Sequence, residues 1–180
     1  MALTATMHRF AIQLSDVDRG VYETIDLHVA RQPSETAEYM LTRVLAYCLE
    51  YREGIAFSKG LAEPDEPPIA VRDLAGALQV WIEIGNPDAA RLHKASKASP
   101  RVAVYTHKDP AQLSRSLAGE RVHKIETIEV FAMDRDLLAW LTERLERRMT
   151  FALMRSDGEL FVTVGEDSRH APLRARSLGL

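Results

Sequence analysis

The sequence contains one cysteine, Cys48, among its 180 residues, and this scarcity excludes several kinds of site. A single cysteine forms no intrachain disulfide framework and no zinc site built from several thiolates. Cys48 also lacks a convincing partner for thiol catalysis. Because it lies in a pattern of helical spacing, we interpret it as a small core residue.

Long apolar runs are missing as well. No stretch approaches the roughly 20 apolar residues that span a bilayer, and His8 and Arg9 interrupt the apolar residues where a signal peptide needs a continuous run. We therefore expect a cytoplasmic protein with no membrane partner. The length predicts a single domain over residues 1–180 with one substantial core.

An excess of positive charge is absent too, because the formal net charge is -3 at pH 7. This charge balance argues against a protein whose surface is generally cationic and binds nucleic acid. Two local clusters of basic residues are still compatible with a nucleic acid as partner. They are Arg91, Lys94, Lys97 and Arg101 in the first, and Arg144, Arg147 and Arg148 in the second.

Several common catalytic motifs do not occur. The sequence has no Gly-rich phosphate loop, no His-Glu-x-x-His and no nucleophile elbow. His93 and His107 are interpreted as ordinary polar or packing residues. With thiol chemistry set aside, the remaining candidate is a metal site made of carboxylates.

The first half of the chain predicts a β-hairpin, a helix and further strands. Alternation and turn residues indicate paired strands over 8–14 and 21–29. Ser34 is the expected N-cap of a helix over about 35–51. Strands follow at 55–57 and 77–84, with an acidic, proline-rich loop at 61–68 between them.

The second half predicts a helix, a strand and then further alternating elements. A helix over 88–99 followed by a strand at 101–106 favours a right-handed βαβ unit with parallel strands. We expect a helix over 110–117, a strand over 125–131, a helix over 134–147 and a hairpin of 149–154 with 159–164. The polar stretch 165–180 is expected to form a flexible tail.

Glu83 is the most conspicuous charged residue, because it lies among the apolar residues of the strand at 77–84. A carboxylate in such a strand is costly to bury unless a cation, a metal or a hydrogen-bond donor meets it. The acidic loop could place Asp65 or Glu66 beside it, and Asp73 is a further candidate. Two or three carboxylates at a strand end can hold Mg²⁺ or Mn²⁺, with Lys94 as a nearby positive charge.

Each of these residues also has a structural interpretation. Glu83 can pair with Arg91 or Lys94, and Glu35 is favoured in a first helical turn by the helix dipole. Lys94 can belong to a solvated helix face. Trp81 is most simply a packing residue, although a tryptophan near a site can stack on a base.

Three stretches of the sequence resemble a known family. They are Ala30-Arg31-x-Pro33-Ser34-Glu35-Thr36, Asp65-Glu66-Pro67 and Trp81-Ile82-Glu83-x-Gly85-x-Pro87-Asp88-x-x-Arg91-x-x-Lys94-Ala95. Together they are similar to the YaeQ family of small bacterial proteins, along nearly the whole chain. The resemblance implies a mixed-sheet α/β fold with a restriction-endonuclease-like PD-(D/E)XK core of order αβββαβ. An N-terminal β-hairpin and a C-terminal helix plus hairpin would flank that core.

By this resemblance Asp65 and Glu83 would be metal ligands and Glu35 an accessory acid. The sequence departs from the motif two residues after Glu83, where Gly85 stands in place of the usual lysine. Lys94 is the best replacement, with Arg91 and Lys97 as further basic residues for substrate. The expected function is phosphodiester hydrolysis of nucleic acid with Mg²⁺ or Mn²⁺. The alternative is a catalytically inactive module that binds nucleic acid or a protein partner.

Overall fold

The computed structural model describes residues 4–59 and 65–178, and contacts within that part divide the chain into two compact units. The first unit comprises Met1–Leu41 and Asp134–Leu173, and the second comprises Thr42–Met133 and Arg174–Leu180. Each unit is built around its own β-sheet. The expected single domain over residues 1–180 stays a prediction.

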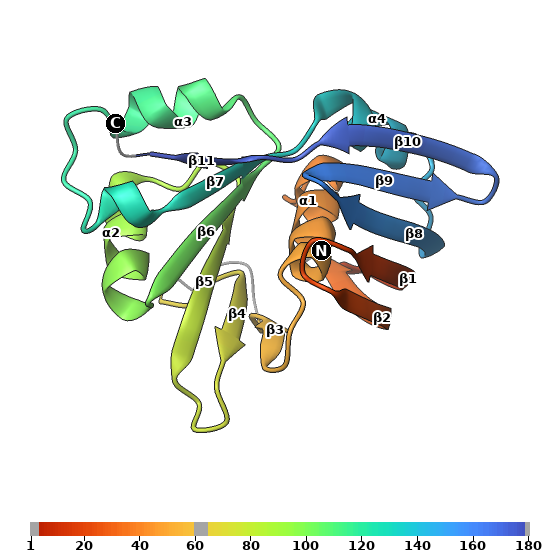
Figure 1. The fold of residues 1–180 in the computed structure, drawn as a ribbon, viewed down its shortest axis with the longest axis horizontal. Coiled ribbons are helices and arrows are strands. Elements are labelled where there is room, and N and C mark those ends of the chain that lie inside the picture. Colours follow the sequence, from red (N-terminus) through yellow and green to blue (C-terminus); the bar gives the residue numbers. More distant parts are fainter. Residues whose placement is uncertain (1–3, 60–64, 179–180) are drawn as a thin grey trace. The chain divides into compact units, whose positions relative to one another are not determined.

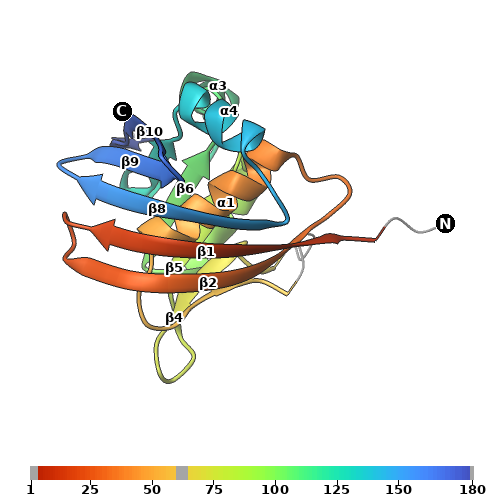
Figure 2. The same cartoon turned by 90° about the vertical axis from the view of Figure 1, so that its right-hand side faces the viewer.

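The described residues of the first unit form a five-stranded mixed sheet of order β10-β9-β8-β1-β2 (Figure 2). Its strands are β1 (Thr6–Asp16), β2 (Val21–Arg31), β8 (Arg148–Ser156), β9 (Glu159–Val164) and β10 (Asp167–Pro172). β1 runs parallel to β8, and the other neighbours are antiparallel. Alternation buries Phe10, Ile12 and Leu14 on one face, which confirms the predicted N-terminal hairpin.

The predicted hairpin of β8 and β9 is also confirmed, with Asp157 and Gly158 at its turn. Both residues have positive φ angles, 52° and 71°, which suit a two-residue hairpin turn. The carboxylate of Asp18 accepts hydrogen bonds from both turn amides, at 2.7 and 3.1 Å. These bonds lower the pKa of Asp18 and fasten the turn to the loop between β1 and β2.

Helix α4 (Arg135–Glu143) begins where the sequence predicts and ends earlier. Asp134 caps it by accepting a hydrogen bond from the Leu137 amide at 2.9 Å. The expected end at Arg147 is wrong. Leu145 continues the apolar spacing in the sequence, but it is only half-buried, and residues 144–147 instead lead the chain into β8.

The expectation of a flexible tail over residues 165–180 is wrong for the residues that the structure describes. Residues 167–172 form β10 against β9, and β11 (Ala175–Ser177) pairs with β7 (Glu129–Ala132). β10 is an edge strand in which Ala171 alone is buried, so its sequence lacks the apolar alternation that predicts a strand.

The described residues of the second unit form a six-stranded mixed sheet of order β11-β7-β6-β5-β4-β3 (Figure 1). Its remaining strands are β3 (Ile55–Phe57), β4 (Ile69–Arg72), β5 (Leu78–Ile84), β6 (Arg101–Thr106) and β7 (Glu129–Ala132). β3, β4 and β5 are antiparallel, whereas β5, β6 and β7 are parallel. Helix α2 (Ala89–Ala98) joins β5 to β6, which confirms the predicted βαβ unit.

Two predictions in this unit need correction. β4 was not expected, because its four residues follow Pro67 and Pro68 and read as part of the loop. The strand expected over 125–131 begins at Glu129, because Ile125–Thr127 forms a 3₁₀ turn after Lys124, whose φ is 48°. Residues 61–64 of the predicted acidic loop lie outside the described residues.

Helices α2 and α3 (Pro110–Leu117) cover one face of the second sheet. Their apolar residues pack on a core that contains Trp81, Leu92, Ala95, Val102, Val104, Leu113, Leu117, Ile128 and Val130. Asp109 caps α3, as the sequence predicts for that helix. No helix in the described part of the chain is long and apolar enough to cross a membrane.

Helix α1 (Ala37–Leu49) carries the chain from the first unit into the second. Its cap is Thr36, whose hydroxyl oxygen accepts a hydrogen bond from the Tyr39 amide at 3.1 Å, so the expected cap at Ser34 is wrong. Cys48 is fully buried, which confirms its interpretation as a core residue. Burial raises the pKa of its thiol above the ordinary value, and a neutral thiol is a poor nucleophile.

Candidate functional site: carboxylates and cations at the end of β5

The local sequence directs α2 back toward the end of β5. Gly85 ends the strand with a φ of 87°, and its amide donates a hydrogen bond to the Tyr105 carbonyl at 2.9 Å. Asp88 then caps α2 by accepting a hydrogen bond from the Arg91 amide at 2.8 Å. Arg91 and Lys94 follow three residues apart, so they lie on neighbouring positions of one helix face.

Glu83 is buried, with 5% of its surface exposed. It shares one face of β5 with Trp81, because residues two apart in a strand point to the same side. Its carboxylate oxygen Oε2 accepts hydrogen bonds from Trp81 Nε1 and Arg91 Nε, each at 2.9 Å. Burial raises the pKa of Glu83 despite these two donors, which oppose the shift.

Arg91 is held by three different groups. Its guanidinium bonds to Glu83, its carbon Cζ lies 5.3 Å from the centre of the Trp81 ring, and its Nη2 donates to the Glu66 carbonyl at 2.7 Å. A planar guanidinium can make such contacts at once because its donors point in fixed, separate directions. Arg91 thereby connects α2, β5 and the segment before β4.

Asp65 forms an ion pair with Lys94, one turn of α2 beyond Arg91. This pair is far more exposed than the Glu83 pair, since 75% of the Asp65 side chain and 47% of the Lys94 side chain are accessible. The pairing of β4 with β5, in which Ile69 lies opposite Ile82, brings the segment before β4 to the end of β5. The two carboxylates suggested by the sequence therefore meet cations on the same helix.

Replacing Lys94 with glutamine is expected to change the free energy of unfolding by less than about 1 kcal/mol, because exposed ion pairs contribute little. Urea denaturation of the two proteins side by side measures this difference. A loss larger than about 2 kcal/mol would show that the Asp65–Lys94 pair has a structural role that its exposure does not indicate.

The two acids that compete with Asp65 have other contacts. Asp73 lies at the turn between β4 and β5, where its carboxylate accepts hydrogen bonds from the Ala75 and Ala77 amides at 3.0 and 2.9 Å. Glu66 meets Arg91 through its backbone carbonyl rather than its carboxylate. Of the three acids, Asp65 is the one whose carboxylate contacts α2.

Glu35 belongs to the first unit, and two of its contacts are with residues close to it in the sequence. Its Oε2 accepts a hydrogen bond from the Gln32 amide at 3.1 Å, and its carbonyl accepts one from Arg31 Nε at 3.0 Å. Because α1 begins at Ala37, Glu35 precedes the first turn instead of occupying it, so the expected position of Glu35 in that turn is wrong. Its role as an accessory acid stays a prediction.

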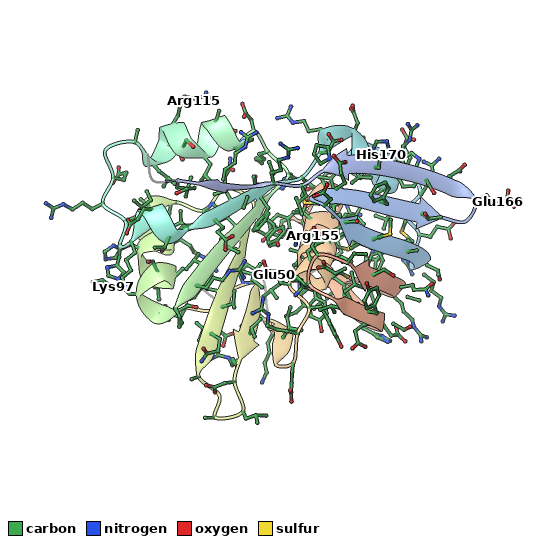
Figure 3. The ribbon with its side chains drawn as sticks, in the orientation of Figure 1. Glu50, Lys97, Arg115, Arg155, Glu166 and His170 are labelled. Atoms are coloured by element: carbon green, nitrogen blue, oxygen red, sulfur yellow. The ribbon has the colours of Figure 1, made fainter. Side chains whose placement is uncertain are left out.

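The backbone explains why the motif lysine is absent at Gly85. A φ of 87° is favourable for glycine and strained for a lysine, so the lysine of the motif does not fit this turn. Lys94 lies on the following helix, close to Asp65, and supplies a cation to the same region. Lys97 is exposed in the last turn of α2, where its charge suits the helix dipole (Figure 3).

The oxygen atoms at this site are of the type that Mg²⁺ and Mn²⁺ prefer. They are the carboxylates of Asp65 and Glu83 and the carbonyl of Glu66. Within the described residues, no group of three or more His, Cys, Asp or Glu side chains is arranged to hold a metal ion. A divalent ion would therefore have to replace Arg91 or Lys94 as the partner of these carboxylates.

Sequence reasoning missed the polar role of Trp81, which it treated as a packing residue or a stacking surface. Trp81 is buried in the core and also donates to Glu83. The spacing of two residues along one strand was the available indication. His93 accepts a hydrogen bond from the His123 amide at 3.1 Å, which agrees with its interpretation as an ordinary polar residue.

The described residues define a mixed α/β protein with two mixed sheets, four α-helices and an acid–cation cluster beside a parallel strand. The chain belongs to the YaeQ family, because the family model described as YaeQ protein matches residues 1–172. It is 31% identical over 176 residues to a protein of Salmonella typhi named "Uncharacterized protein YaeQ". A protein of the same name from Escherichia coli K12 is 30% identical over 176 residues. Each match covers 97% of both chains.

Two solved structures of this family are similar to the whole fold. The crystal structure of YaeQ protein from Pseudomonas syringae has a TM-score of 0.85 and 32% identity, covering 95% of each chain. The crystal structure of YaeQ protein from Xanthomonas axonopodis pv. citri has a TM-score of 0.86 and 31% identity. That match covers 97% of this chain and 99% of the other. The mixed α/β fold is therefore the fold of the family.

Proposed function

We propose that this protein is a metal-dependent, nuclease-like hydrolase that acts on phosphodiester bonds of nucleic acid. One observation carries the proposal: Glu83 contacts Arg91 and Asp65 contacts Lys94, two cations three residues apart on α2. Carboxylates for a metal and cations for a phosphate are the parts that such a reaction needs.

The order of elements from α1 to β6 supports this proposal. Helix α1 is followed by β3, β4 and β5, then by α2 and the parallel strand β6. This is the αβββαβ order expected of a PD-(D/E)XK core. In that core the candidate ligands lie before the second strand and near the end of the third, which here are Asp65 and Glu83.

A bound Mg²⁺ or Mn²⁺ would polarise a phosphate oxygen and lower the pKa of a coordinated water. The residues of this chain have separate tasks around it. Asp65 and Glu83 would hold the ion, and Lys94, which is half-exposed, would be free to move from Asp65 to a phosphate oxygen. Arg91, once displaced from Glu83, offers a planar pair of donors to the same phosphate.

A second function has its own supporting observation. Each candidate ligand already has a cation as partner, and Arg91 has two further contacts besides Glu83. Carboxylates that are already paired with cations are less available to a metal. This arrangement therefore favours a module that binds nucleic acid or a protein partner without cleaving it. Such binding of nucleic acid depends steeply on salt and little on divalent ions.

Metal binding can be followed through Trp81, because its indole donates to Glu83. The chain has two tryptophans, so Trp140→Phe leaves Trp81 as the only reporter. Titration of Mn²⁺ or Mg²⁺ into this variant is expected to give a saturable fluorescence change. Adding Glu83→Gln should abolish the change, and adding Asp65→Asn should weaken binding by about tenfold or more.

Asp73→Asn is the matched control, because Asp73 belongs to the same hairpin but caps its turn. We expect it to bind metal as the Trp140→Phe parent does. A fluorescence that does not respond to either ion would contradict the assignment of Glu83. An equal loss in Asp65→Asn and Asp73→Asn would contradict the assignment of Asp65.

The same proteins should then be incubated with mixed single-stranded and double-stranded DNA and RNA. Metal-dependent cleavage by the parent that Glu83→Gln lacks would support the nuclease function. Nucleic-acid binding without cleavage, insensitive to divalent ions, would instead support the binding module. Cleavage that survives both Asp65→Asn and Glu83→Gln would show that the catalytic site lies elsewhere.

A further inference from the structure

The first unit contains a groove of about 600 Å³ between α4 and β10. One wall is formed by successive residues of β10, namely Arg169, His170, Ala171 and Pro172. Side chains of a strand alternate between its two faces. A wall to which four consecutive residues contribute is therefore the edge of the strand rather than either face.

This edge has no neighbouring strand among the described residues, because β10 is the last strand of its sheet. Ala171 lies opposite Leu160, and continuing this pairing by two residues puts Leu173 opposite Gly158. The Leu173 amide donates a hydrogen bond to the Gly158 carbonyl at 2.8 Å, so this is a hydrogen-bonded position. In an antiparallel pair, hydrogen-bonded and non-hydrogen-bonded positions alternate. The peptide groups of residues 168, 170 and 172 therefore point away from β9, toward the edge.

Pro172 agrees with this assignment. A proline within a sheet is tolerated where its missing amide hydrogen faces an unpaired edge. Pro172 has the same parity as His170, so the amide hydrogen and carbonyl of His170 are presented outward. Figure 3 labels His170 on this strand. An added strand would find its hydrogen-bond partners there.

The other wall of the groove is one face of α4. Asp136, Trp140 and Glu143 recur at helical spacing and line the groove, with Ala139 between them. Asp136 and Glu143 are exposed, whereas the Trp140 side chain is buried, with the Arg144 guanidinium 4.4 Å from the centre of its ring. The wall therefore combines a buried aromatic ring with exposed carboxylates.

The charge of this region selects the kind of partner. Four carboxylates line the groove, against Arg169 and a histidine; they are Asp134, Asp136, Glu143 and Glu159. The first unit as a whole has 14 Asp and Glu residues against 9 Lys and Arg, whereas the second has 12 against 14. A basic partner is therefore attracted to the first unit.

We propose that the groove between α4 and β10 binds an extended, basic peptide segment, which adds to the edge of β10 as a further strand. Backbone hydrogen bonds to residues 168 and 170 would supply affinity, and the carboxylates of α4 would select lysine or arginine side chains. The six residues of β10 span about 20 Å and the nine of α4 about 13 Å, enough for about four peptide residues. This goes beyond the proposed function, since it concerns the other unit and a different partner.

A fluorescein-labelled peptide of eight alternating lysine and valine residues tests the proposal by fluorescence anisotropy at about 150 mM salt. We expect saturable binding to the full chain. A peptide of alternating glutamate and valine should bind at least about tenfold more weakly. A lysine–valine peptide N-methylated at alternate residues should also lose about tenfold, because it cannot donate to one strand edge.

The protein variants separate the groove from general charge. Asp136→Lys with Glu143→Lys should weaken binding by about tenfold or more. Glu166→Lys is the matched control, because Glu166 is exposed in the turn between β9 and β10, away from the groove lining (Figure 3). Its affinity should stay within about twofold of the parent. Hydrogen exchange should slow at the His170 amide when the peptide is present.

Three results would overturn the proposal. One is the absence of binding by the lysine–valine peptide up to about 1 mM, which would leave Arg169 and Pro172 simply as residues that protect an edge strand. Equal losses in the groove variant and in Glu166→Lys would reduce the interaction to general charge attraction. Unchanged affinity of the N-methylated peptide would exclude strand addition.

Discussion

Replacing Glu50 with alanine is expected to lower the free energy of unfolding of the second unit by about 3 to 5 kcal/mol. Glu50 is 3% exposed, and its carboxylate accepts hydrogen bonds from Arg101 at 2.6 and 3.1 Å and from the Tyr105 hydroxyl at 2.8 Å. Removing it takes away the acceptor that a partly buried guanidinium and a buried hydroxyl share. Such groups cost far more when one partner is deleted than the pair contributes when intact.

The protonation of Arg101 reflects the same network. Burial alone would lower its pKa, but the hydrogen bonds and charges of Glu50 and Glu129 raise it above the ordinary value. Arg101 Nε bonds to Glu129 at 2.8 Å, so the guanidinium joins Glu50, the residue that follows α1, to β6 and β7. Figure 3 labels Glu50 within this unit. Glu50→Gln should lower the free energy of unfolding by about half as much as Glu50→Ala, because glutamine retains an acceptor for Tyr105.

Urea denaturation followed by Trp81 fluorescence in the Trp140→Phe background measures these losses in the second unit. Glu53→Ala is the control, because Glu53 is an exposed acid three residues along, and we expect a change within about 0.5 kcal/mol. Equal stability of Glu50→Ala and Glu53→Ala would contradict the network. If this Trp81 transition coincides with the transition that Trp140 reports in a Trp81→Phe variant, the result would also support the single domain predicted from chain length.

Arg91→Ala is expected to destabilise the protein by about 3 kcal/mol near pH 8 and by only about 1 kcal/mol near pH 5. Without Arg91, Glu83 remains buried with one donor fewer, and burial already raises its pKa. A carboxyl whose pKa is higher in the folded than in the unfolded state contributes stability below the unfolded value. That contribution is lost as the pH rises through the folded value.

Urea titrations at several pH values measure this dependence. The double variant Arg91→Ala with Glu83→Gln should remove most of the pH dependence, because it lacks the titrating carboxyl. Arg115→Ala serves as a control, since Arg115 is exposed on α3 (Figure 3) and should change stability by less than about 0.5 kcal/mol at any pH. A cost of Arg91→Ala that is the same at pH 5 and pH 8 would show that Glu83 does not titrate in this range.

Elements with a strong local pattern were predictable from the sequence. The first hairpin and β6 alternate clearly, and Asp88, Asp109 and Asp134 cap the helices expected after them. β4 and β10 were not predictable for opposite reasons. The first is four residues long and follows two prolines, and the second is a polar edge strand with one buried side chain.

The candidate site was predictable as a set of residues but not as a set of contacts. The sequence indicates that Glu83 needs a partner, and Arg91 is one of the two cations that it offers. The bond from Arg91 to the Glu66 carbonyl depends on tertiary packing that no local pattern encodes. The burial of Glu50 was not predictable, because one acid after an apolar helix resembles an ordinary surface residue and its partners come from β6.

The several contacts of Arg91 make two equilibria interdependent. A ligand that draws Arg91 away from Glu83 also withdraws its bond from the Glu66 carbonyl, so occupancy of the site and attachment of residues 65 and 66 are thermodynamically coupled. Because such coupling is reciprocal, tighter attachment of this segment lowers the affinity for the ligand by the same factor. This coupling predicts that the amides around β4 exchange hydrogen more slowly in the free protein than in the liganded protein.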